Sequence, residues 1–331
     1  MPGEEAITIV LPVYGRSELL APALTSVLAL EGEAWQLLIA DDGSDAATAA
    51  FLEEWMQAHG NSRVQWQRRP RNLGLFANLN QAIAEATTAW VLLLCSDDLL
   101  LPGALRHLKQ LRERWPEPNL ILSTFHSINA DASPRPADSA WHHDQVSPTT
   151  AVVPPERFVP ALLQLGSLNG NLSGMAFRRA LWEQAGPFRA QWRHAADWEW
   201  LLRAAEQGPV VLNRTPIAQV RTHASQLSNS NRRSGHELRE VAEVVATLRQ
   251  HPLLAEEPRR HDWAAAVMQH QLWNRVKQLP SNGPGPLLES LKPIHAAAGL
   301  RRTAQALLDS APKRLQGWRQ HWVIHGAGPN R

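Results

Sequence analysis

The chain has 331 residues, of which 44% are hydrophobic and 19% charged, a composition that excludes a disordered chain. Its formal net charge of +2 gives no reason to expect a nucleic-acid partner. Its single cysteine, Cys95, excludes an internal disulfide. No apolar run reaches the ~18 residues of a membrane-spanning helix, and the first apolar run is too short for a secretory signal, so we expect a cytoplasmic protein.

Short apolar runs alternate with amphipathic segments through the first half of the chain. The runs predict strands at Ile7–Val13, Trp35–Ala40, Val64–Gln67, Trp90–Leu94 and Asn119–Ile128. Helical spacing is found at 18–30, 46–59, 75–86 and 103–114. This alternation is typical of βαβ units and predicts an α/β fold with a mostly parallel sheet between helices.

The second half continues with shorter elements. Helices are predicted at 155–165, 178–185 and 197–206, and strands at 173–177, 209–213 and 216–220, whereas 130–147 has the composition of a loop. A polar linker, Ser228–Gly235, precedes a largely helical region that is interrupted at 280–286. We therefore predict two domains, residues 1–230 and a helical C-terminal extension at 231–331.

Acidic pairs follow two of the predicted strands. Asp41 and Asp42 come after the second strand, and Asp97 and Asp98 after the strand that begins at Trp90. Since the carboxyl ends of parallel strands share one edge, both pairs are expected there, where oxygen ligands suit Mg²⁺ or Mn²⁺. A simpler interpretation is that Asp42 and Asp98 cap the helices that follow them.

Seven segments resemble, in order, the motifs of glycosyltransferase family 2, which has the GT-A (Rossmann-like) fold. They are LPVYGR, LLIADDGSDAAT, RNLGLFANLNQAI, LLLCSDDLLLPGAL, GNLSGMAFRRALWEQAGPF, HAADWEWLLRAAEQG and VRTHASQLS, within residues 6–230. The resemblance implies inverting transfer of a sugar from a nucleotide-diphosphate sugar to a hydroxyl of a glycan or glycolipid acceptor, in polysaccharide or glycoconjugate synthesis.

The resemblance also implies a role for individual residues. Those expected to bind the nucleotide-sugar are Pro12, Val13, Tyr14, Asp42, Asn72, Gly74, Asn80 and Asp97. Asp97, Asp98 and His223 are the expected ligands of a divalent cation, Mg²⁺ or Mn²⁺, and Asp197 is the expected catalytic base. Two simpler interpretations stay open: Asp197 as a partner of the helix dipole, and His223 as a packed or solvated histidine.

The sequence departs from the family pattern at the metal motif. Cys95 stands where the first acid of the D-x-D motif is usual, and Glu199 follows Asp197 in A-D-W-E. The lost acid favours an alternative, a non-catalytic nucleotide-sugar- or glycan-binding protein on the same scaffold.

The C-terminal extension carries the excess of basic residues, whereas acids exceed bases before Ser230. Trp318 and Trp322, four residues apart, would share one helix face. The pair could anchor the protein peripherally at the inner face of a membrane or, by tertiary packing, form part of the protein interior or a homodimer seam.

Overall fold

The computed structural model describes residues 6–32, 34–135, 141–168, 171–223 and 236–325, and their side chains except at 141–142, 236 and 313–325. The chain divides into two compact units. The first unit comprises residues 1–162 and 167–237, and the second comprises 163–166 and 238–331. The predicted linker 228–235 lies almost entirely outside the described residues, and the boundary near residue 230 stays a prediction.

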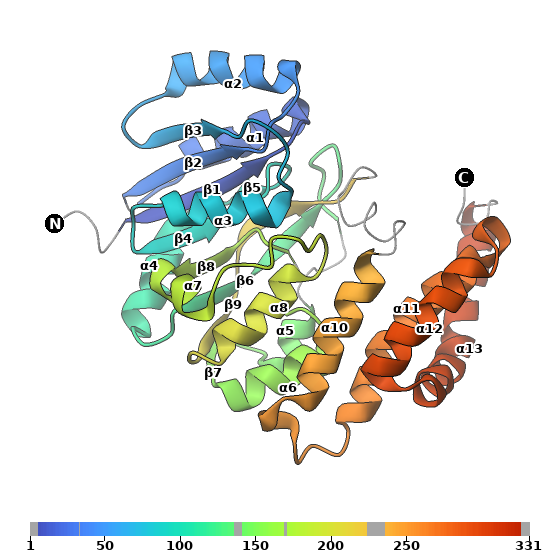
Figure 1. The fold of residues 1–331 in the computed structure, drawn as a ribbon. Helices are drawn as coiled ribbons and strands as arrows, with labels where there is room; N and C mark the ends of the chain where they lie inside the picture. The colour runs from blue at the N-terminus through green and yellow to red at the C-terminus, as the bar shows by residue number, and fades with distance from the viewer. Residues whose placement is uncertain (1–5, 33, 136–140, 169–170, 224–235, 326–331) are drawn as a thin grey trace. The chain divides into compact units, whose positions relative to one another are not determined.

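In the described part of the first unit, nine strands form one sheet (Figure 1). They are β1 (Ile7–Val13), β2 (Trp35–Asp41), β3 (Val64–Arg68), β4 (Trp90–Leu93), β5 (Leu99–Leu100), β6 (Leu120–Ile128), β7 (Ala151–Val153), β8 (Met175–Arg178) and β9 (Val210–Arg221). Their order is β3-β2-β1-β4-β8-β6-β9-β5, and β7 also pairs with β9. All strands run one way except β5, β7 and β8, which pair antiparallel with their neighbours. The mixed, mostly parallel sheet expected from the sequence is confirmed.

Helices connect the strands of this unit. They are α1 (Ser17–Leu28), α2 (Ala46–His59), α3 (Leu75–Glu85), α4 (Ala104–Arg114), α5 (Trp141–Val146), α6 (Pro155–Leu165, which ends in the second unit), α7 (Arg179–Ala185) and α8 (Ala196–Ala205). Every residue of β1 is buried, as expected for a central parallel strand covered on both faces.

The structure differs from the predicted elements at several places. The segment predicted as a loop at 130–147 contains the short helix α5, and the strands β5 and β7 were not predicted. The two strands predicted at 209–213 and 216–220 are a single strand, β9, whose pairing with β6 shifts register after Asn213. Pro216, which has no N–H to donate, lies in this irregular stretch. The strand pattern is therefore interrupted in the sequence at a position where the strand itself continues through a bulge.

The described part of the second unit is helical. It consists mainly of α10 (His236–Gln250), the 3₁₀ turn η1 (Pro252–Leu254), α11 (Arg260–Asn282), α12 (Gly285–Ala298) and α13 (Leu300–His325). α11 contacts both α12 and α13. None of the described helices is long and apolar enough to cross a membrane. Trp318 and Trp322 belong to the part of α13 whose side chains lie outside the described residues.

Candidate active site

The strands β1, β2, β4, β6 and β9 all end at one edge of the sheet (Figure 1). Beyond these ends lie Tyr14, Asp42, the turn Cys95–Asp98, Asn129 and His223. β8 opposes this direction, so its start, just after Ser173, lies at the same edge. Segments from all along the first unit thereby meet where ligands bind in sheets of this type.

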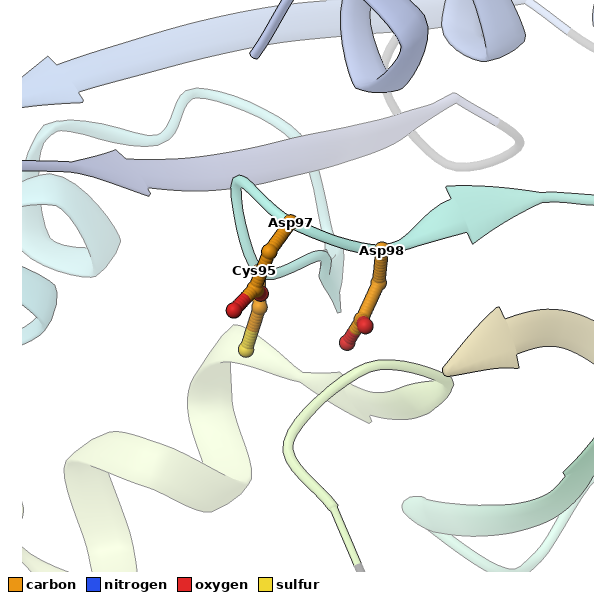
Figure 2. Close-up of side chains that lie close together, drawn as sticks. All are labelled: Cys95, Asp97 and Asp98. Atoms are coloured by element: carbon orange, nitrogen blue, oxygen red, sulfur yellow. The ribbon is translucent and has the colours of Figure 1, made fainter. Parts of the chain in front are cut away.

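The turn between β4 and β5 presents three potential ligand atoms together. The Asp98 N–H donates to the Cys95 carbonyl oxygen across 3.1 Å and closes the turn. As Figure 2 shows, the side chains of Cys95, Asp97 and Asp98 leave the turn toward the same side. One ligand atom from each lies within 4.8 Å of the others.

Asp98 is the buried acid of this turn, with 1% of its surface exposed. Its Oδ2 accepts a 2.6 Å hydrogen bond from the Ser173 hydroxyl, and its Oδ1 accepts a 2.8 Å bond from the Arg221 N–H. Burial, reinforced by the charge of Asp97, raises the pKa of Asp98 to about 8. These two hydrogen bonds connect the turn to Ser173, just before β8, and to Arg221, the last residue of β9.

The simpler interpretation of Asp98 as a helix cap was wrong. α4 begins at Ala104 after Gly103, and no side chain caps its first turn. The Asp98 carboxyl is instead directed to β8 and β9.

Asp97 is the more accessible acid, with 17% of its side chain exposed. Its Oδ2 lies 2.9 Å from Nε2 of His223 and 3.5 Å from the guanidinium of Arg16. Arg16 has a left-handed backbone, φ 62° and ψ 50°, which is uncommon for a residue other than glycine and turns the chain into α1. Two cationic or hydrogen-bonding groups from distant segments therefore converge on one carboxylate oxygen.

The donor set at Asp97 fits a divalent cation. A carboxylate oxygen and an imidazole nitrogen 2.9 Å apart are both ligands that Mn²⁺ accepts, and the carboxylate also suits Mg²⁺. Asp98 fits less well, since it is 1% exposed and its two oxygens hold Ser173 and Arg221 in place. Asp97 and His223 are therefore the pair best arranged to hold an ion.

Arg221, which the sequence analysis did not single out, holds this arrangement together. It is 3% exposed, its Nε donates to the Asp97 carbonyl oxygen across 2.9 Å, and its terminal nitrogen donates to the carbonyl oxygens of Ala130 (2.7 Å) and Asn129 (3.2 Å). A buried charge requires such partners. The signal was present in the sequence as an arginine directly after the predicted strand 216–220, two residues before His223.

Cys95 lies beside this site, and its backbone N–H and its thiol each contact a neighbouring side chain. Its N–H donates to Ser173 Oγ (2.9 Å), and its Sγ donates to Asn171 Oδ1 (3.6 Å). Enclosure of the thiol, together with the charges of Asp98 and Asp97, raises the pKa of Cys95 well above its usual value. The sequence analysis also missed Ser173 and Asn171, because the sequence around them indicates only the beginning of a strand.

Asp42 shapes the turn before α3. Its two oxygens accept hydrogen bonds from the N–H groups of Leu73 (2.7 Å) and Gly74 (2.9 Å), and burial raises its pKa although these bonds oppose the shift. Gly74 has φ 91°, a conformation that favours glycine. The alternative of Asp42 as cap of α2 was wrong, since Asp45 caps that helix through Thr48 N–H at 2.8 Å.

The remaining residues that were expected to bind the nucleotide-sugar differ in exposure. Pro12 and Val13 are buried within β1, whereas Tyr14, directly after the strand, is 56% exposed. Asn72 is exposed in the turn that Asp42 organises. Asp41 is fully buried: its Oδ1 accepts from the Ser44 N–H (2.9 Å), and its Oδ2 lies 3.5 Å from Nε of Arg68.

Asn80 has a structural partner. Its Nδ2 donates to the Phe188 carbonyl oxygen (2.8 Å), and its Oδ1 accepts from the Phe188 N–H (2.9 Å). This two-way pairing ties α3 to the segment that leads into α8. The amide of Asn80 is thus engaged with the backbone of the chain.

Asp197 lies on the first turn of α8, as the helix-dipole interpretation also requires. Residues 206–209 join the end of α8 to the start of β9, so α8 runs back along the sheet and its first turn lies toward the carboxyl edge (Figure 1). The Asp197 Oδ1 accepts from the Trp198 N–H across 2.9 Å.

Glu199, in contrast, is committed to the fold. It is 6% exposed and pairs with Arg203 (2.8 Å) and Arg189 (3.1 Å). Arg203 also donates to the carbonyl oxygens of Gly186 and Pro187. This network fixes the approach to α8 and leaves Asp197 as the acid of its first turn with a partly exposed side chain.

Comparisons with known proteins agree on the family. Residues 8–158 match the model of glycosyl transferase family 2. The chain is 26% identical to the putative glycosyltransferase EpsE of Bacillus subtilis over 30% of this chain and 35% of that protein. It is 31% identical to the succinoglycan biosynthesis protein ExoO of Rhizobium meliloti over 31% of this chain and 28% of that protein. In each case the chain spans well under two thirds of the relative's length.

Solved structures show the same fold. TarS 1–349 of S. aureus, in complex with UDP-GlcNAc, superposes with a TM-score of 0.66 at 14% identity and covers 95% of this chain and 92% of that one. The mannosyltransferase PcManGT of Pyrobaculum calidifontis, in complex with GDP-Man and Mn²⁺, gives a TM-score of 0.50 at 15% identity over 96% of this chain and 80% of that one. The expected GT-A architecture is confirmed.

Proposed function

Because the chain belongs to glycosyltransferase family 2, we propose that it transfers a sugar, with inversion, from a nucleotide-diphosphate sugar to an acceptor hydroxyl. The observation that carries the proposal is the 2.9 Å approach of His223 to Asp97 at the carboxyl edge of the sheet. Polysaccharide or glycoconjugate synthesis is the proposed context, with a glycan or glycolipid as acceptor.

Asp97 and His223 would hold a Mg²⁺ or Mn²⁺ ion, which supplies positive charge to a diphosphate leaving group. The Mn²⁺ of the PcManGT complex and the UDP-GlcNAc of the TarS complex support this proposal. Arg221 keeps the Asp97 backbone in place, so the carboxylate direction is set before a donor binds.

The donor-side turn would receive the nucleotide. The exposed ring of Tyr14 offers a face for the base, and Asn72 and Gly74 border it. Each oxygen of Asp42 has a second lone pair besides the one used by the backbone, so Asp42 can also accept from the base or ribose.

Asp197 is the proposed general base. It would accept the proton of the acceptor hydroxyl as that oxygen attacks the anomeric carbon, on the face opposite the departing diphosphate. A general base must reach the hydroxyl it deprotonates, and a partly exposed carboxylate at the carboxyl edge meets that condition.

A thermal-shift screen of UDP-, GDP- and dTDP-sugars with and without Mn²⁺ identifies the donor, and NMR of the first-formed product then tests inversion. We expect a donor whose stabilisation increases with Mn²⁺ and a product of inverted anomeric configuration. A product that retains the configuration contradicts the mechanism.

Cys95, which stands where the first acid of the D-x-D motif is usual, favours a second candidate, a nucleotide-sugar- or glycan-binding protein without turnover. Calorimetry separates the two functions. Donor binding with no transfer across an acceptor panel would support the second candidate.

A further inference from the structure

A cavity of about 490 Å³ lies beside the candidate active site, in the first unit. Its lining comes from β6 at 124–128, from Pro134 and Arg135, and from the β9 residues Arg214, Pro216 and Gln219. None of these residues has a role in the donor site described above.

Two pairings place the cavity next to the Asp97 turn. Gln219 is the β9 partner of Leu99, the residue that follows Asp98. At the other end, Ile128 is the β6 partner of Arg221, whose guanidinium binds the Asp97 carbonyl oxygen. The cavity is therefore within reach of a molecule that also contacts the carboxyl edge.

The strand register gives the cavity a polar floor. Phe125 and Ala218 are paired and belong to the hydrophobic core, so the next pair, His126 and Gln219, faces the opposite side of the sheet. His126 is exposed. Imidazole and amide groups therefore line the face that the core does not cover.

The walls of the cavity are cationic. Arg214 is paired with Asp144, but Arg135 has no carboxylate partner among the described residues, and its side chain makes only a 3.5 Å contact with Asn129 Oδ1. The described residues that line the cavity include no Asp or Glu. A guanidinium without a carboxylate favours a ligand that brings its own negative charge.

We propose that this cavity is an acceptor subsite for an acidic glycan and that Arg135 binds the carboxylate or phosphate group of that glycan. The inference rests on the proposed function, since it supplies the acceptor for the same edge of the sheet. His126 and Gln219 would donate to the hydroxyl groups of the sugar that carries the charge.

Calorimetry of the full chain tests the proposal with three probes: a glucuronate-containing oligosaccharide, its carboxyl-reduced neutral form, and a sugar phosphate. We expect at least one acidic probe to bind about tenfold or more tightly than the neutral form, and Arg135→Gln to remove the difference. Arg135→Lys should keep part of it. The matched control is Arg301→Gln, an exposed arginine of α13, which should bind as the unmodified chain does. The preferred acidic probe distinguishes a carboxylate from a phosphate acceptor.

Equal binding of charged and neutral probes, or an Arg135→Gln variant that binds like Arg301→Gln, would overturn the subsite. UDP, GDP and dTDP titrated in parallel separate this inference from the proposed function. Binding of a nucleotide without charge-selective binding of the acidic probes refutes the subsite alone. Arg135-dependent binding of an acidic probe, with none of the three nucleotides bound, supports the anion site and counts against the donor function.

Discussion

At the scale of single residues, the acids of the carboxyl edge divide into accessible and buried groups. Asp97 and Asp197 are partly exposed, whereas Asp98 and Asp42 are buried and accept hydrogen bonds from neighbouring segments. Reaction chemistry needs the first kind, and a stable site needs the second kind to fix the turns.

Asp197→Asn removes the proposed base while it keeps the size of the side chain. We expect kcat to fall by a factor of about 10² to 10⁴, with donor affinity unchanged, because only the proton acceptor is lost. Steady-state kinetics and calorimetry with the donor measure the two quantities. Turnover that stays at the original rate would remove Asp197 from this role.

Arg221→Lys keeps the buried charge but loses the planar group that reaches Asp97, Asn129 and Ala130 together. We expect the Mn²⁺ dissociation constant to rise by a factor of about 10 to 100, as for residues that orient metal ligands. Paramagnetic relaxation of water protons measures Mn²⁺ binding without turnover. Arg203→Lys, which changes a buried ion pair of α8, serves as the control and should bind Mn²⁺ normally.

Asp98 gives the protein a pH-dependent stability in the presence of a chelator. Its pKa is about 8 in the folded chain and near 3.9 in the unfolded chain, so the folded state holds an extra proton between these values. Its contribution is therefore complete below pH ~4, is lost as the pH rises, and changes little above pH ~8, with a slope of at most ~1.4 kcal/mol per pH unit. Denaturant unfolding from pH 5 to 9 should show this slope for the unmodified chain and a flatter dependence for Asp98→Asn. The same slope in both proteins would show that Asp98 does not titrate in this range.

At the scale of elements, hydrogen bonds between side chain and backbone connect the turn before α3 to the segment before α8. Asp42 holds the turn before α3, and Asn80 of the same helix holds Phe188, which precedes α8. The Glu199–Arg203 pair secures the same approach from within α8. The position of Asp197 thus depends on contacts that begin on the donor side.

Asn80→Ala leaves the N–H and C=O of Phe188 without these partners. We expect a loss of about 1–3 kcal/mol in the free energy of unfolding and a lower kcat, with donor affinity retained. Thermal unfolding and donor calorimetry measure both effects, and Gln81→Ala at the neighbouring, exposed position is the control. A large loss of donor affinity with unchanged stability would instead support direct contact of Asn80 with the donor.

The sequence predicted most elements of the parallel half because apolar runs and helical spacing are local signals. The resemblance to the family also predicted that Asp97, Asp98 and His223 lie close together, and in the structure Asp97 lies beside both of the others. The sequence could not reveal Arg221, Ser173 or the engagement of Asn80, since these depend on partners 75 to 124 positions away. Strand β5 was missed because its two residues are too few to show the alternation of side chains that indicates a strand.

At the scale of the whole molecule, the basic helical region beyond residue 237 is a separate unit whose function the donor site does not explain. Trp318 and Trp322, whose side chains lie outside the described residues, are four positions apart in the sequence of this region. The prediction that a helix face carrying this pair contacts an anionic membrane surface, with attraction added by the basic charge, stays a prediction, as does the alternative of a seam between copies.

The double variant Trp318→Ser, Trp322→Ser should lose binding to vesicles that contain anionic lipid, because the apolar contact is removed while the basic charge stays. Flotation at low and high salt measures the binding. Leu288→Ser, at an exposed leucine of α12, should float as the unmodified chain does. If the double variant floats as well and only its oligomeric state changes, the face is a seam between copies.

The insertion of β8 between β4 and β6 has a consequence for the synthesis of this protein. A ribosome delivers the Cys95–Asp98 turn long before Ser173, so an emerging chain that stops short of β8 exposes a carboxyl group whose anchor has not yet been made. The carboxyl edge of the sheet therefore becomes ordered only after the second half of the first unit has been translated. Truncated products should be inactive even when their parallel strands have formed.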